Sequence, residues 1–142
     1  MSDLAYSFMK FSKKLIPKSK PPLKILKQER SSSAIIFYWG VKHSFRQLDL
    51  HNIFFSKNYA KEFESIFKNK TVYEDPTIYV NITSKDVLND APKGCENWFV
   101  MVNTPANLNV ASQENIKKTK DFIIDFLDKP NLLAFPINRL FS

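Results

Sequence analysis

The side chains of this sequence that could carry chemistry are one cysteine, two histidines and several carboxylates. Cys95 and His51 could act as a nucleophile and its base, with Asn97 orienting the base, because a thiol becomes reactive when a base lies beside it. The spacing along the chain does not favour this pairing, and Cys95 lies in a predicted turn that leads into a strand. We therefore predict no thiol catalysis.

Metal binding by His43, His51 and Cys95 is not predicted, because no two of them have the short spacing of paired zinc ligands. Asp121 and Asp125 stand four residues apart on a predicted helix, where paired carboxylates usually form a solvated face. The sequence thus assigns no catalytic residue and no metal ligand.

Glycine is scarce, since the 142 residues include only Gly40 and Gly94. A dinucleotide-binding turn needs the pattern G-x-G-x-x-G, so that the backbone can approach a pyrophosphate. A P-loop needs two glycines five residues apart, followed by Lys and Ser or Thr. Two glycines at these positions form neither pattern, so we expect no flavin or nicotinamide dinucleotide to bind this chain alone.

The hydrophobic pattern predicts an α+β fold, with a mixed or antiparallel sheet of about four strands and helices packed on one side. Helices are expected after Ser56, which we predict as an N-cap, and after Ser112, which we predict as another. An amphipathic helix is also expected before Pro17. The predicted strands lie at 34–39, 50–55, 77–83 and 98–102.

Two of these strands are expected to be central. The five consecutive apolar residues at 98–102 predict a strand buried on both faces, between a turn at Pro92 and Gly94 and a stop at Pro105. The apolar segment 34–39 is predicted to be a central strand that ends at Gly40.

The aromatic content is high, with thirteen Phe, five Tyr and two Trp. Core packing is one interpretation, and an apolar ligand surface is the other, because ligand pockets are lined mainly by apolar and aromatic side chains. Strand side chains alternate between two faces, and the sequence does not choose which face would meet a ligand. The candidate ligand-binding residues are Phe37, Tyr38, Trp39, His51, Asn52, Ile53, Phe54 and Phe55.

The formal net charge is +7, and residues 10–27 are rich in lysine. A solvated helix and linker is one interpretation of this segment, and contact with anionic lipid headgroups is the other. Nucleic acid is not predicted as a partner, because no aromatic and basic RNA-binding motif is present. The longest apolar run, at 34–39, is far shorter than the roughly 20 residues of a membrane span. We expect a cytoplasmic location, with peripheral contact to the inner face of the membrane as the open alternative.

The segment 91–100, Ala-Pro-Lys-Gly-Cys-Glu-Asn-Trp-Phe-Val, resembles the A-P-x-G-C-E-N-x-F-V segment of bacterial-type phytoene (carotenoid) desaturases. These are FAD-dependent enzymes of the amine-oxidase-like superfamily. Three further segments match in the same order, at 29–34, 51–56 and 76–85. The matches correspond only to the middle, substrate-domain part of the family.

The resemblance implies that residues 1–129 are a substrate-binding-domain segment of a carotenoid desaturase, with 130–142 as an unmatched tail. The full-length enzyme would dehydrogenate a long polyene with FAD as hydride acceptor, and this piece would supply the substrate tunnel. The flavin-binding residues of the family lie before and after the matched region, so FAD and activity are not expected for this chain alone. The implied partners are an apolar polyene and the missing flavin-binding portion. The alternative is a stand-alone module that binds an apolar ligand or a membrane surface without catalysis.

Overall fold

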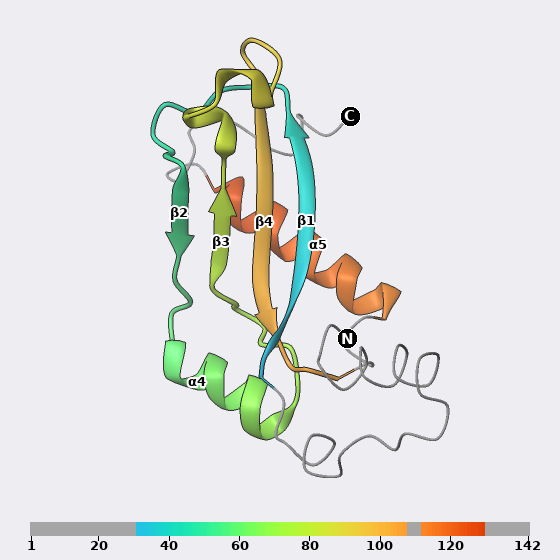
Figure 1. The fold of residues 1–142 in the computed structure, drawn as a ribbon. Helices are drawn as coiled ribbons and strands as arrows, with labels where there is room; N and C mark the ends of the chain where they lie inside the picture. Colours follow the sequence, from blue (N-terminus) through green and yellow to red (C-terminus); the bar gives the residue numbers. More distant parts are fainter. Residues whose placement is uncertain (1–30, 108–111, 130–142) are drawn as a thin grey trace, which may run out of the picture. The chain divides into compact units, whose positions relative to one another are not determined.

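The computed structural model describes residues 31–107 and 112–129 (Figure 1). Every element named below lies within the unit Ser32–Ser142. The predicted N-terminal helix, the lysine-rich segment 10–27 and the tail 130–142 lie outside the described residues.

Within the described residues, four antiparallel strands form one sheet in the order β1-β4-β3-β2 (Figure 1). This arrangement confirms the predicted α+β fold, with its sheet of four strands. The strands are β1 (Ser33–Val41), β2 (His51–Phe54), β3 (Ile78–Asn81) and β4 (Glu96–Thr104).

The central position of β4 is confirmed, since it pairs with β1 on one side and β3 on the other. The predicted central position of β1 is wrong, because β1 lies at the end of the sheet. Gly40 does not end β1 either, since the strand continues to Val41, which pairs with Glu96. The apolar run of β1 arises because the side chains on both of its faces are apolar, and it does not indicate that β1 has a neighbouring strand on each side.

One face of the sheet, which we call the core face, packs under α5 (Gln113–Leu127) (Figure 1). Trp98, Val100 and Val102 of β4 point to this face and are almost completely buried. Ile123 and Leu127 of α5 are buried in the same cluster. Burying this apolar surface is the main force that holds the helix against the sheet.

The opposite face, which we call the open face, carries the alternate residues of each strand. Ile36 and Tyr38 of β1 are exposed there, and Phe99 and Met101 of β4 are half-buried. The prediction that 98–102 is buried on both faces is therefore wrong. An unbroken apolar run does not distinguish two covered faces from one covered face and one apolar surface.

The first described helix, α4 (Tyr59–Glu64), continues into a π-helical turn, η2 (Ser65–Asn69). Its N-cap is Asn58, whose side chain accepts a hydrogen bond from the Lys61 N–H at 3.0 Å. The prediction of Ser56 as the cap is wrong, because Ser56 is buried and its N–H donates to Thr77 Oγ1 at 3.2 Å.

Ser112 caps α5 as predicted and accepts a hydrogen bond from the Asn115 N–H at 3.2 Å. The predicted turn before β4 is also present: the Cys95 N–H donates to the Pro92 carbonyl at 2.9 Å, and Gly94 has a φ of +80°. Glycine suits this left-handed position because it has no Cβ. Two 3-10 turns, η3 (Thr83–Lys85) and η4 (Leu88–Asp90), connect β3 to this turn.

Candidate ligand-binding face

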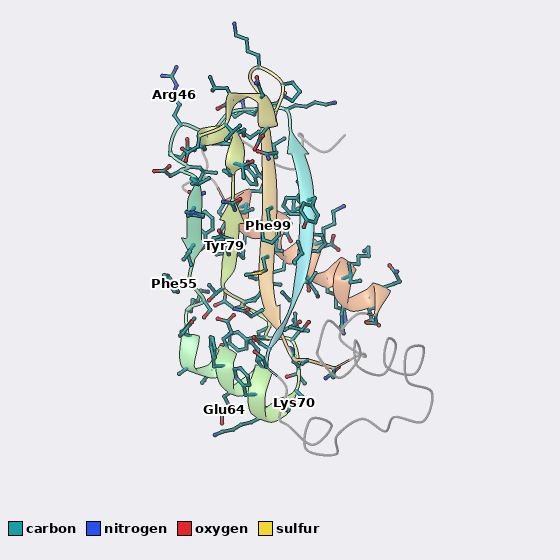
Figure 2. All side chains as sticks on the ribbon, in the orientation of Figure 1. Arg46, Phe55, Glu64, Lys70, Tyr79 and Phe99 are labelled. Carbon is teal, nitrogen blue, oxygen red and sulfur yellow. The ribbon has the colours of Figure 1, made fainter. Side chains whose placement is uncertain are left out.

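An aromatic belt crosses the open face, with one ring from each of the four strands: Tyr38, Phe99, Tyr79 and His51. The ring centroids of Tyr38 and Phe99 are 5.4 Å apart, and those of Phe99 and Tyr79 are 6.3 Å apart, both edge to face. The rings of Tyr79 and His51 are stacked at 6.0 Å. Figure 2 shows Tyr79 and Phe99 on the side of the sheet turned away from α5. These spacings are those of mutually stabilising ring pairs.

On one side of the belt the open face is apolar. Ile36, Met101, Tyr79 and Ile53 pair in register across the four strands. Just beyond the end of β2, Phe55 contacts the ring of Tyr59 at 5.9 Å. Tyr38, Ile53 and Phe55 are 78%, 53% and 66% exposed. Large apolar side chains exposed on one face of a sheet mark a binding surface more often than scattered ones do.

On the other side of the belt is an open hollow of about 440 Å³. Its polar wall is fixed by Asn97, whose Nδ2 donates to Thr83 Oγ1 at 2.7 Å and whose Oδ1 accepts from the Ser84 N–H at 2.9 Å. The Thr83 hydroxyl donates in turn to Asp90. The hollow is lined by Tyr38, Trp39, Gly40, Asn81, Thr83, Asn97, Trp98 and Phe99.

Glu96 holds the surrounding loops against β4 from the core face. Its buried carboxylate accepts hydrogen bonds from the Phe45 N–H at 2.9 Å and from Trp98 Nε1 at 2.9 Å. It also pairs with Lys85 Nζ at 2.6 Å. Glu96 and Asn97, adjacent in the matched segment 91–100, therefore fix two loops from opposite faces of one strand.

The structure does not bring the eight predicted ligand residues together. Phe37, Trp39 and Phe54 pack against the core, although Trp39 also lines the hollow. Asn52 ties β2 to its neighbours, since its Nδ2 donates to the carbonyls of Asp49 and Val80. The four that lie on the open face or at its edge are Tyr38, His51, Ile53 and Phe55.

Sequence reasoning missed three residues of this face: Tyr79, Asn81 and Phe99. The alternation of Ile78, Tyr79, Val80 and Asn81 contained the signal, because buried β-branched residues alternate with side chains that can face outward. Phe99 gave no comparable signal, since its neighbours in sequence are all apolar.

The thiol and metal hypotheses gain no support from the geometry. The His51 ring contacts Tyr79 and Asn81, and the Asn97 side chain bonds to Thr83 and Ser84. Within residues 31–107 and 112–129, no group of three His, Cys, Asp or Glu side chains could hold a metal ion. Over the same residues, no helix has both the length and the apolar character needed to cross a membrane.

Several known proteins are similar in sequence to this chain. The chain is 62% identical over 111 residues to a 1-hydroxycarotenoid 3,4-desaturase of Flavobacterium sp. (strain P99-3), a match covering 73% of this chain and 23% of the relative. It is 35% identical over 101 residues to a phytoene desaturase of Fusarium fujikuroi, covering 71% and 17%. It is 34% identical over 105 residues to a 4,4'-diaponeurosporene oxygenase of Staphylococcus aureus, covering 73% and 21%. No model of a protein family matches the chain.

The class that these relatives define is that of the carotenoid desaturases and related carotenoid oxygenases. Within this class the chain corresponds to a segment of a carotenoid desaturase, as its resemblance at 91–100 indicated. The chain spans less than a quarter of the length of these curated relatives.

Proposed function

We propose that the open face is a substrate platform of a carotenoid desaturase, on which a long apolar polyene lies while the redox step is carried out by other parts of the enzyme. The observation that carries this proposal is the aromatic belt across all four strands, with its exposed apolar flank. Residues 1–129 would form the substrate-binding-domain segment, with 130–142 outside it.

The chemistry of the face suits a polyene. Aromatic rings and aliphatic side chains offer contact area without requiring polar partners, as apolar ligand sites do. The relatives are named for reactions on carotenoids, including phytoene and a 1-hydroxycarotenoid. Stacking of a flat conjugated chain on the belt would exclude water from it and hold it in one orientation.

FAD is the cofactor that the family resemblance implies, and it does not fit the described residues. A pyrophosphate needs a glycine-rich turn at a helix N-terminus. The first turn of α5 carries Glu114, whose carboxylate would repel a phosphate. The N-terminus of α4 is capped by Asn58, with the buried Glu62 in its first turn. We therefore assign hydride acceptance to a flavin-binding portion outside these residues.

The buried Glu62 has a structural role instead. Its Oε1 accepts from the Thr77 N–H at 3.0 Å, and its Oε2 accepts from the Thr77 hydroxyl at 2.6 Å. These bonds join α4 to the residue that precedes β3, so they set the position of the helix beside the platform.

The test measures how much carotenoid the purified chain retains. A long linear hydrocarbon carotenoid is added from detergent, free pigment is removed by gel filtration, and bound pigment is measured by its visible absorbance. The double variant Tyr38→Ser/Ile53→Ser removes two exposed apolar contacts and should weaken binding at least about tenfold. Leu88→Ser is the matched control, because Leu88 is 84% exposed on η4 and does not line the hollow.

Equal retention by the double variant and by Leu88→Ser would refute the platform, as would a wild-type chain that retains no pigment. The membrane-binding alternative would be favoured if the wild type retained no pigment but cosedimented with anionic vesicles, and if both variants cosedimented equally well.

A further inference from the structure

We propose that His51 and Tyr79 form a subsite on the open face that binds a hydroxyl group at the end of the polyene. This inference rests on the proposed platform function. The subsite would make the open face prefer hydroxylated polyenes over pure hydrocarbons. The aromatic belt alone would bind both equally well.

The two side chains are held together by short contacts. His51 Nδ1 lies 2.8 Å from the Tyr79 hydroxyl oxygen and 3.2 Å from Asn81 Nδ2. The rings of His51 and Tyr79 are stacked with an interplanar angle of 20°. His51 is exposed, whereas Tyr79 and Asn81 are half-buried, so the polar atoms lie at the surface of a supported group.

Asn81 determines which imidazole nitrogen carries the proton. Its Nδ2 also donates to the Leu50 carbonyl at 3.0 Å, which fixes the amide orientation, because the flipped amide would place an oxygen against that carbonyl. The amide group beside His51 Nδ1 is therefore a donor, and it disfavours an N–H at Nδ1. Neutral His51 consequently carries its hydrogen on Nε2, and the Tyr79 hydroxyl donates to Nδ1.

This arrangement leaves one donor and one acceptor for a ligand. The donor is His51 Nε2–H, and the acceptor is the oxygen of Tyr79, whose hydrogen is directed to Nδ1. The two groups lie on opposite sides of the imidazole ring, because the Tyr79 hydroxyl bonds to Nδ1 and the Nε2–H bond is directed away from it. A terminal alcohol therefore pairs with one of them, and we assign it as a donor to the Tyr79 oxygen. A hydrocarbon end would cover this oxygen without pairing it, and a site built around a polar group discriminates against a ligand that lacks the partner.

The position of the pair is consistent with an end-group subsite. His51 lies on β2, the strand at one end of the sheet, and the belt runs from it through Tyr79 and Phe99 to Tyr38 on β1. Ile53 is two residues along β2 on the same face, so apolar surface adjoins the polar pair. A polyene lying along the belt would place its terminus at His51.

The experiment compares two carotenoids of equal length, one with a terminal hydroxyl and one without, bound to the purified chain. Tyr79→Phe removes the oxygen and keeps the ring. Tyr73→Phe is the control, since it removes a hydroxyl beside Asn115 and Phe122 of α5 and not on the open face. We expect the wild type and Tyr73→Phe to bind the hydroxylated carotenoid about tenfold more tightly than the hydrocarbon, the effect of one hydrogen bond.

Tyr79→Phe should reduce this preference to about twofold or less, with its affinity for the hydrocarbon unchanged. His51→Phe should also lower the preference, because the Tyr79 hydrogen is then no longer directed away from the ligand. Near-ultraviolet circular dichroism should show that each variant is folded. Equal affinity of the wild type for the two carotenoids, or a preference that survives Tyr79→Phe, would overturn the subsite and leave the platform standing. Failure of the wild type to bind either carotenoid would overturn both.

Discussion

Glu96→Gln is the substitution whose effect on stability follows most directly from the structure. The side chain of Glu96 is 3% exposed, and its two oxygens have different partners. Oε1 accepts from the Phe45 N–H, from Ser44 Oγ and from Lys85 Nζ, whereas Oε2 accepts from Trp98 Nε1. Glutamine has nearly the same shape but only one acceptor atom, and its NH₂ group can only donate.

Either orientation of the glutamine amide leaves a donor facing a donor. With the NH₂ group in the place of Oε2 it faces the Trp98 indole, and in the place of Oε1 it faces the Phe45 N–H. An unpaired buried donor costs about 1–3 kcal/mol. Lys85, 17% exposed, also loses its counter-charge and keeps the Phe45 carbonyl at 2.6 Å. We expect a total loss of about 3–4 kcal/mol in the free energy of unfolding, within the range for breaking a buried ion pair.

Urea denaturation followed by tryptophan fluorescence measures this loss, because Trp98 is itself buried against Glu96. The control is Glu114→Gln, which breaks a pair with Lys118 at the same 2.6 Å distance but with side chains 74% and 72% exposed. Lys118 lowers the pKa of Glu114, so acidification through that pKa removes this pair too. Neither change should measurably affect stability. A loss below about 1 kcal/mol for Glu96→Gln would refute the argument from burial.

Four further predictions use the same protein. An added Cβ would meet no atom within 4 Å at Gly94 or at Gly40, so neither substitution causes a clash. Gly94→Ala should nevertheless lower the free energy of unfolding by about 1 kcal/mol, because Gly94 has a φ of +80°. Gly40→Ala should not carry this backbone cost. Ser112→Ala should cost about 1 kcal/mol through loss of the α5 cap, measured by the same urea titration. The purified chain should show no flavin absorbance, and a near-stoichiometric flavin band would contradict this expectation. The chain should enhance the fluorescence of a hydrophobic dye, and Tyr38→Ser/Ile53→Ser should reduce that signal.

Much of the fold could be predicted because local signals agree with the tertiary structure. Pro92 and Gly94 specify a turn that needs a positive φ, and Ser112 specifies a helix start, so both were found correctly. The cap of α4 was not, because Ser56 and Asn58 are both good capping residues. The choice between them depends on the bond from the Ser56 N–H to Thr77, which is 21 residues away in sequence.

The candidate site was only partly predictable for a similar reason. The segments 37–39 and 51–55 do contribute to the open face, but the face that each side chain joins depends on the register between strands. Phe37 pairs with Val100 and so belongs to the core, whereas Tyr38 pairs with Phe99 and belongs to the belt. Alternation of apolar and polar residues helps to set the register, and the unbroken apolar run at 34–39 lacks this alternation.

The position of β1 at the end of the sheet also affects solubility. Its nine residues, Ser-Ala-Ile-Ile-Phe-Tyr-Trp-Gly-Val, contain no charge and no proline, although end strands usually carry such features to prevent pairing with other molecules. Segments of this composition readily form intermolecular β-structure when they are exposed. We expect the protein to aggregate through β1 at high concentration, and we expect Ile36→Lys to prevent this aggregation. The same substitution would place a charge on the apolar flank. Resistance to aggregation therefore favours a charged side chain on β1, whereas binding of the polyene favours an apolar one.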